Sequence, residues 1–201
     1  MDFIKFPKIA RISRDCVITE KIDGTNAQIF IVDETEVASD LSGKFAGMDD
    51  KLIVKINNSY IFAGSRNRFL IPTKDNKGFA KWVLENAEDL STLGGGNHYG
   101  EWWGQGIQRN YGLKEKRFSL FNVHRWDNST RPKCCGVVPT LYNGIFDTEN
   151  VDKILGLLKH SGSLAEPGFM KPEGIVIFHT HGSYLFKKTI ENDSVPKSEV
   201  K

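Results

Sequence analysis

The sequence predicts an α+β domain of mainly antiparallel sheets flanked by a few helices. Many short apolar runs with strand composition are separated by turn residues. Only two stretches, at about residues 79–90 and 148–160, place apolar residues at helical spacing. Many strands combined with two helices favour this class of architecture.

Composition sets the size and the general class of the protein. A chain of 201 residues suits one domain, which we place at residues 1–190, followed by a polar tail at 191–201. The formal charge of +2 gives no sign of a strong general nucleic-acid binder, although charge can still be concentrated locally. No apolar run has the length of a signal peptide or a membrane span. Three cysteines, with Cys134 and Cys135 adjacent, indicate reduced thiols and a cytoplasmic protein.

The first third of the chain is expected to be strand-rich. Residues 1–14 mix apolar and basic side chains and are expected to form a short edge strand or an arm. Residues 16–32 have the pattern of two strands, and residues 33–50 have the composition of a loop. A hairpin is expected over 52–63, because Asn57-Asn58 tolerates the positive φ angles of a tight turn.

Two helices are expected further along the chain. The first covers about 79–90, with Asp75 and Asn76 before it as capping candidates. The second covers about 148–160, with Asp147 as its N-cap. The remaining strands are expected at 98–108, 118–123, 174–178 and 184–186, with a short segment at 137–142 in which Pro139 argues against a central strand.

Lys21 stands out as a candidate functional residue. It lies between two apolar runs, Cys16-Val17-Ile18 and residues 27–32, and the chain turns at Gly24 shortly after it. A lysine amine is a nucleophile only when it is unprotonated, and burial or a neighbouring cation favours that state. The alternative is a surface lysine in a D-G hairpin turn.

Six short motifs follow one another in a fixed order, and together they span residues 20–188. They are Glu20-Lys21-Ile22-Asp23-Gly24-Thr25-Asn26, Gly64-Ser65-Arg66, Tyr99-Gly100-Glu101-Trp102-Trp103-Gly104, Phe118 to Val123, Lys171-Pro172-Glu173-Gly174-Ile175-Val176, and Phe186-Lys187-Lys188. In this order they resemble the motifs of the covalent nucleotidyltransferase superfamily, which contains DNA ligases, RNA ligases and mRNA capping enzymes. The chain is most similar to the type-2 RNA ligases. The resemblance implies a nucleotidyltransferase (ATP-grasp-like) domain.

The resemblance implies a covalent reaction at Lys21. Its amine would attack the α-phosphate of ATP, form lysyl-AMP and expel pyrophosphate, a transfer that depends on charge neutralisation and positioning. Lys187 and Lys188 would supply positive charge at that phosphate, in one of two possible registers of the motif. Glu173 would bind Mg²⁺ (or Mn²⁺), and Asp23 would be a second ligand or, alternatively, would stabilise the turn before Gly24.

The resemblance also implies a set of nucleotide contacts. Glu101 would accept a ribose hydroxyl, Phe121 would stack on adenine and Arg66 would grip ribose or a 5′-phosphate. The alternative for Phe121 is a core aromatic, and for Arg66 a solvated charge at a hairpin end. The implied set is completed by Glu20 near the adenine, Gly24 at the turn, and Asn26 at the nucleic acid or a nucleotide phosphate.

The implied activity is that of an ATP-dependent RNA ligase. It would join 5′-phosphate and 3′-hydroxyl ends of RNA, or of DNA-containing duplexes, through lysyl-AMP and an adenylylated 5′-end, in a bacterial or phage-infected cell. We expect neither the OB domain of DNA ligases nor the helical domain of type-2 RNA ligases after residue 190. The alternatives are a GTP-using capping-type guanylyltransferase and a non-catalytic nucleic-acid-binding relative.

Overall fold

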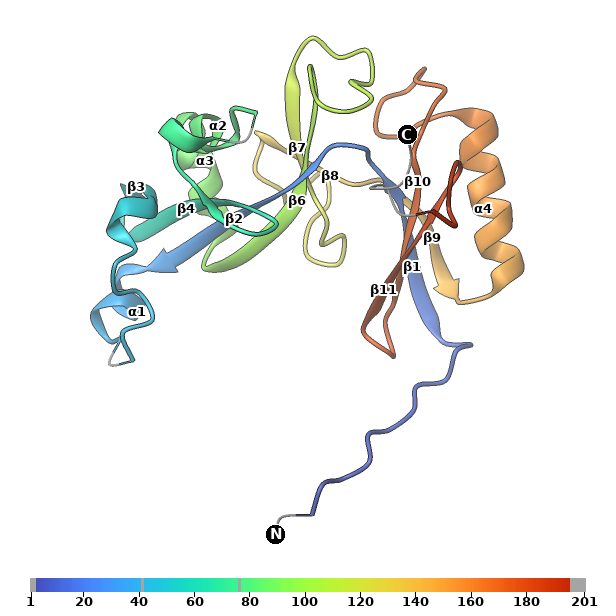
Figure 1. Cartoon of the computed structure of the whole chain (residues 1–201), viewed down its shortest axis with the longest axis horizontal. Helices are drawn as coiled ribbons and strands as arrows, with labels where there is room; N and C mark the ends of the chain where they lie inside the picture. The colour runs from blue at the N-terminus through green and yellow to red at the C-terminus, as the bar shows by residue number, and fades with distance from the viewer. Residues whose placement is uncertain (1–2, 41, 76, 196–201) are drawn as a thin grey trace. The chain divides into compact units, whose positions relative to one another are not determined.

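The computed structural model describes residues 3–40, 42–75 and 77–195. The chain divides into two compact units, the first formed by Met1–Ile22 and Pro139–Lys201, the second by Asp23–Val138. Both units are built on mostly antiparallel sheets, which confirms the predicted α+β class (Figure 1).

A seven-stranded sheet forms the second unit, with the strand order β3-β4-β2-β6-β7-β8 and β5 paired to β4. All pairings are antiparallel except the parallel β7–β8 pair. The strands are β2 (Thr25–Asp33), β3 (Leu52–Ile56), β4 (Ser59–Ser65), β5 (Phe69–Leu70), β6 (Gly96–Gly104), β7 (Lys116–Leu120) and β8 (Cys135–Val137).

Alternation along these strands separates a core face from an opposite face that carries polar side chains around Asn26 and Glu101 and aromatic rings such as Phe30 and Phe62; we call this opposite face the polar face. Ala27, Ile29 and Ile31 of β2 point into the core, where Trp102 and Phe118 join them. Because side chains directly opposite one another in paired strands share a face, the intervening residues of β2, β6 and β7 lie on the other side of the sheet. These intervening residues include Asn26, Glu101 and Ser119.

The predicted helix over 79–90 is broken in the structure. It forms α2 (Phe79–Glu85) and α3 (Ala87–Leu90), which meet at Asn86, whose side chain donates to the Trp82 carbonyl. The N-cap of α2 is Gly78, whereas Asp75 accepts from the backbone amides of Ala80 and Lys81; Asn76 lies outside the described residues.

The predicted loop over 33–50 proved wrong in part. It contains the short helix α1 (Glu34–Ala38), capped by Asp33, which accepts from the backbone amide of Thr35. The acidic residues that indicated a loop instead occupy the first turn of α1, where negative charge favours a helix. Single-turn 3-10 helices occur at Asp49–Lys51, Pro72–Lys74 and Ser91–Leu93.

The first unit holds a four-stranded antiparallel sheet in the order β11-β10-β1-β9. Its strands are β1 (Asp15–Lys21), β9 (Thr140–Ile145), β10 (Gly174–His179) and β11 (Tyr184–Thr189). Helix α4 (Thr148–Ser161), capped by Asp147 as predicted, covers one face of this sheet (Figure 1). Pro139 precedes β9, an edge strand, as its lack of an amide hydrogen favours.

Residues 3–14 form an arm rather than an edge strand. The chain leaves β1 at its N-terminal end and runs as an extended segment that belongs to neither a helix nor a strand (Figure 1). All twelve residues are exposed. The base of the arm is fixed by two hydrogen bonds, from His179 Nε2 to the Ile12 carbonyl and from the Phe146 amide to the Arg14 carbonyl.

Candidate active site

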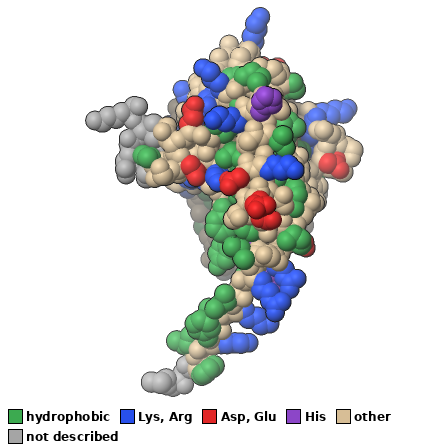
Figure 2. All heavy atoms as spheres, turned by 90° about the vertical axis from the view of Figure 1, so that its right-hand side faces the viewer, with side chains coloured by type: hydrophobic (Ala, Val, Ile, Leu, Met, Phe, Trp, Pro, Cys, Tyr) green, Lys and Arg blue, Asp and Glu red, His purple; other side chains and the backbone are tan. Residues whose placement is uncertain are grey.

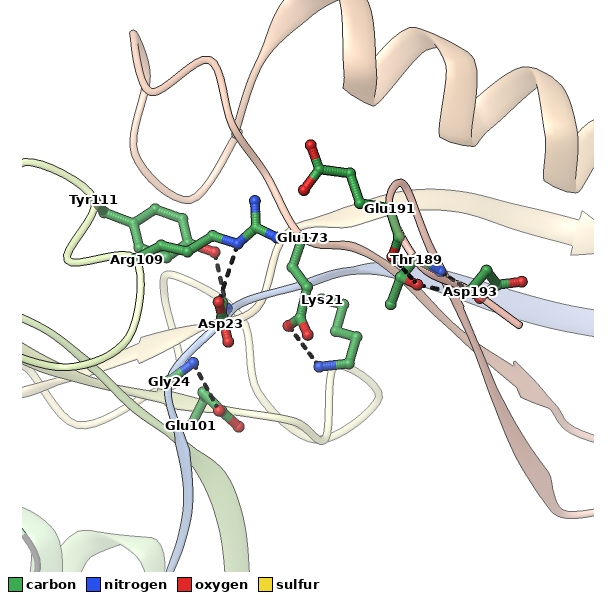
Figure 3. Close-up of polar contacts among 10 residues, drawn as sticks. All are labelled: Lys21, Asp23, Gly24, Glu101, Arg109, Tyr111, Glu173, Thr189, Glu191 and Asp193. Atoms are coloured by element: carbon green, nitrogen blue, oxygen red, sulfur yellow. Dashed lines mark hydrogen bonds and ion pairs between the residues drawn. The ribbon is translucent and has the colours of Figure 1, made fainter. Parts of the chain in front are cut away.

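Lys21 is the last residue of β1, and its side chain forms an ion pair with Glu173. The antiparallel register places Lys21 opposite Gly174, the first residue of β10. Glu173, which immediately precedes β10, therefore lies beside Lys21. Lys21 Nζ lies 2.6 Å from Glu173 Oε2, and the two side chains are 21% and 3% exposed (Figure 3). The pairing of β1 with β10 therefore brings the predicted nucleophile into contact with the predicted metal ligand.

The turn alternative for Lys21 is wrong. A D-G hairpin would pair the strands on either side of it, but β1 pairs with β9 and β10, whereas β2 pairs with β4 and β6. The chain therefore passes from one sheet to another after Lys21. Gly24 lies where this connection comes close to β6, and a Cβ there would stand 2.5 Å from the Trp102 carbonyl oxygen.

Glu20 points to the opposite face of β1 and is buried. Its Oε1 accepts from Ser163 Oγ, and its Oε2 accepts from the amides of Leu164 and Ala165 at 2.7 and 2.9 Å. The carboxylate thus anchors the loop that follows α4. The sequence pattern gave no signal for this loop contact, because the partners lie more than 140 residues away.

The register of β11 separates the two predicted phosphate-binding lysines. Lys188 lies opposite Ile175 of β10, on the face covered by α4, and forms an ion pair with Asp152. Lys187 lies opposite Val176, which in turn lies opposite Thr19 of β1. Since Thr19 and Lys21 are two residues apart on one strand, Lys187 shares the face of Lys21.

Asp23 is held by two residues that lie outside the six sequence motifs. Its Oδ2 accepts from Arg109 Nε at 3.0 Å, and its backbone amide donates to Tyr111 Oη at 2.8 Å (Figure 3). Both partners come from the loop after β6, in which Gln108, Asn110 and Tyr111 all have positive φ. Such angles are rare outside glycine, and they mark a loop shaped by its contacts.

Glu101 binds the backbone of the segment that connects β1 to β2. Its Oε1 accepts a hydrogen bond from the Gly24 amide at 3.0 Å (Figure 3). Asn26 lies directly opposite Glu101 in the β2–β6 pair, on the polar face of the sheet. Phe121 follows β7 two residues after Ser119, the partner of Glu101. Phe121 is 38% exposed, so the core alternative for this ring is wrong.

Arg66 directly follows β4, and its side chain is exposed. The two tryptophans of the third motif point to opposite faces. Trp102 belongs to the core, whereas Trp103 is buried on the polar face with its Nε1 donating to Ser119 Oγ. This alternation is the one expected of neighbouring residues on a single strand.

Two classes of feature are absent from the part of the chain that the structure describes. Among these residues no three His, Cys, Asp or Glu side chains gather closely enough to hold a metal ion. None of the described helices is both long and apolar enough to cross a membrane.

Comparison with known proteins places the chain in a family. The model of the RNA ligase family matches residues 14–190. The chain therefore belongs to the RNA ligase family. A search of curated proteins found no match.

The fold is similar to that of RNA ligase from Naegleria gruberi. An apo mutant of that enzyme matches with a TM-score of 0.55 at 19% identity, covering 88% of this chain and 50% of the Naegleria chain. A mutant solved with ATP and Mn matches with a TM-score of 0.55 at 18% identity, over 89% and 50% of the two chains. This chain thus spans about half the length of the Naegleria chains.

Proposed function

We propose that this protein is an ATP-dependent RNA ligase that acts through a lysyl-AMP intermediate on Lys21. The observation that carries the proposal is the 2.6 Å pair of Lys21 with the nearly inaccessible Glu173, in a chain whose residues 14–190 match the RNA ligase family. Lys21 is fixed at a strand end by a buried carboxylate, whereas a lysine on the surface needs no such fixed position. This arrangement supports a role in catalysis.

In the first proposed step, the adenylylation of Lys21, one bond to phosphorus forms and one breaks. Lys21 Nζ, after losing a proton, forms a bond to the α-phosphorus of ATP, while the bond from that phosphorus to the bridging oxygen breaks and pyrophosphate leaves. The AMP is then transferred to a 5′-phosphate of RNA. A 3′-hydroxyl finally attacks the adenylylated end, forms a phosphodiester and releases AMP.

Several side chains are proposed to bind and orient the nucleotide. Glu101 would accept a ribose hydroxyl and Phe121 would stack on the adenine. Glu101 lies opposite Ser119 on the polar face of the sheet, and the exposed Phe121 comes two residues after Ser119. The exposed guanidinium of Arg66 suits a phosphate or ribose contact. Asn26 would contact a phosphate, and Gly24 would allow close approach of backbone. Glu20 would act near the adenine through its backbone, because its carboxylate already binds the 163–165 loop.

A divalent cation fits the donor set of this site. Glu173 offers hard carboxylate oxygens beside Lys21, and Mg²⁺ or Mn²⁺ needs only one or two carboxylates when phosphates complete its shell. When bound, the metal would neutralise charge on the phosphates. Asp23 is proposed as a second, water-mediated ligand; its carboxylate is held in place by Arg109. Lys187, on the face of Lys21, would add positive charge at the phosphate.

The first experiment is the intact mass of the purified protein with ATP and Mg²⁺. We expect a gain of one AMP that pyrophosphate reverses, and we expect Lys21→Ala to lose it. Lys55→Ala is the matched control, because Lys55 also pairs with a glutamate, Glu34, at 2.5 Å on an unrelated strand. Labelling of Lys21→Ala would refute the nucleophile. A covalent GMP from GTP would indicate a capping-type enzyme, and RNA binding without any adduct would indicate a non-catalytic relative.

A second assay addresses the polynucleotide. With 5′-phosphorylated RNA, RNA–DNA hybrid and DNA substrates compared side by side, we expect RNA ends to be sealed preferentially. Sealing of DNA alone would contradict the assignment of RNA as the substrate. The three cysteines are free thiols in the structure, in keeping with the proposed cytoplasmic location.

A further inference from the structure

The arm at residues 3–14 is a triplet repeat. Its sequence divides into Phe3-Ile4-Lys5, Phe6-Pro7-Lys8, Ile9-Ala10-Arg11 and Ile12-Ser13-Arg14, each with an apolar first residue and a basic third residue. A period of three matches neither an α-helix nor a β-strand. It matches polyproline II geometry, which has three residues per turn and which Pro7 favours.

Such a period gives the arm two different edges. In polyproline II geometry the first residues of the triplets align along one edge and the third residues along another, with successive basic residues about 9 Å apart. The structure shows the stretch before Ile12 as extended chain without strand pairing (Figure 1). The arm therefore presents an apolar edge and a basic edge to the same surroundings.

Neither edge is covered. The apolar residues are among the most exposed of the described chain, with Phe3 at 92%, Phe6 at 77% and Ile9 at 84%. Among the described residues no ion pair involves Lys5, Lys8, Arg11 or Arg14. Figure 2 shows the arm as a projecting strip of hydrophobic and basic side chains. An apolar strip of this kind indicates a binding partner.

Charge is concentrated in this segment. Residues 3–14 carry four positive charges and no negative one, and the whole chain carries +2, so the remainder of the chain carries a formal charge of −2. The arm is therefore a basic segment on a chain whose remainder is net acidic, and such a segment attracts a polyanion.

We propose that the arm binds the single-stranded part of the RNA substrate, an inference that rests on the proposed ligase function. Lysine and arginine side chains along one edge contact phosphates, while Phe3 and Phe6 stack on unpaired bases. Single-stranded nucleic acid presents both charged backbone and open base faces, and its binding sites combine basic and aromatic residues. A duplex hides its base faces, so it would leave the apolar edge unused.

The test is RNA binding by the full chain as a function of salt, using a 5′-phosphorylated single-stranded 12-mer. The arm variant is Lys5→Gln, Lys8→Gln and Arg11→Gln combined. The control variant is Lys81→Gln, Lys153→Gln and Lys159→Gln, which removes three exposed basic residues from α2 and α4. Both variants change the net charge equally, so a difference between them reports position.

We expect the arm variant to reduce the slope of log affinity against log salt by about 2, since each lost phosphate contact contributes about 0.7. The loss of affinity in the arm variant relative to wild type should then be about 100-fold greater at 0.1 M salt than at 1 M salt. The control variant should retain most of the slope. Replacing Phe3→Leu and Phe6→Leu keeps the edge apolar, and it should weaken binding by about tenfold without changing the slope.

AMP uptake by Lys21 is measured on the same preparations. Adenylylation that is retained while RNA binding falls supports the arm proposal. Equal slopes for wild type and arm variant, or no binding of the single strand by wild type, would overturn it and leave the lysyl-AMP proposal standing. A switch of oligomeric mass, or lost binding to anionic vesicles with RNA binding intact, would assign the arm to another partner and also overturn it.

Discussion

The ion pair between Lys21 and Glu173 joins two of the sequence motifs, residues 20–26 and residues 171–176. A carboxylate that is 3% exposed is expensive to bury unless it is paired, and here the lysine ammonium supplies the pairing. In the proposed reaction the amine of Lys21 attacks phosphorus only in its unprotonated form. On that proposal Glu173 has two roles: it holds the resting lysine in place, and it binds a metal ion once its ion pair with Lys21 is given up.

Replacing Glu173 by glutamine tests this dual role. Glu173→Gln keeps the shape and removes the negative charge, so we expect lysyl-AMP formation to slow by about 100-fold or more. The measurement is the single-turnover rate of AMP uptake at saturating ATP and Mg²⁺. Glu34→Gln is the control, because it breaks the comparable Lys55 pair without touching the site. A Glu173→Gln rate within twofold of wild type would remove Glu173 from the reaction.

A second residue-scale prediction concerns pH and His98. Burial lowers the pKa of the His98 imidazole; the hydrogen bond from Nε2 to the Gly94 carbonyl opposes this, and the charge of Arg125 adds to it. Because the folded-state pKa is below the unfolded value, the unfolded chain binds the proton more readily. Stability should therefore be fully present above about pH 6.5 and should decrease as the pH falls below it.

Thermal unfolding between pH 7.5 and 5 measures this effect. We expect Tm of the wild type to fall by a few degrees over this range through His98, and the His98→Gln variant, which cannot titrate there, to lose less. Gln keeps a donor for the Gly94 carbonyl. Parallel pH profiles of the two proteins would show that His98 does not contribute.

At the scale of elements, strand register decides what the motif sequence left open. The Phe186-Lys187-Lys188 motif admitted two registers. In β11 Lys188 faces α4 and Lys187 shares the face of Lys21, an arrangement that favours Lys187 as the lysine proposed to act at the phosphate. We expect Lys187→Ala to slow AMP uptake by about 10- to 100-fold. Lys188→Ala should leave the rate within a fewfold of wild type and lower stability by about 0–1 kcal/mol, the usual contribution of an exposed ion pair. The reverse order of effects would contradict this register.

How far the sequence could predict the site depends on whether a contact is local. The strand runs, the helix at 148–160 and the order of motifs were readable because each uses a short pattern. The positions of Arg109 and Tyr111 were not, because the loop that carries them has positive φ at non-glycine residues, for which composition gives no signal. The ties of Glu20 to residues 163–165 join distant segments, so they depend on the tertiary fold.

At the scale of the whole molecule, the proposed chemistry and the proposed RNA arm occupy different parts of the chain. Every residue assigned to nucleotidyl transfer lies within 14–190, the stretch that matches the RNA ligase family, whereas most of the arm precedes it. Every residue in 3–11 is exposed, and the hydrogen bonds that fix the base of the arm begin at Ile12. The two functions should therefore separate on truncation.

Deleting residues 2–11 tests this separation. We expect Tm to change by no more than about 2 °C, because no described side chain in 3–11 is buried and exposed substitutions usually alter stability by under about 0.5 kcal/mol. AMP uptake by Lys21 should stay within twofold of wild type, measured by intact mass over time, while sealing of single-stranded RNA ends should fall with RNA affinity. A truncated protein that unfolds or no longer takes up AMP would show that the arm supports the fold or the first step. Full sealing activity without the arm would show that RNA is held elsewhere on the molecule.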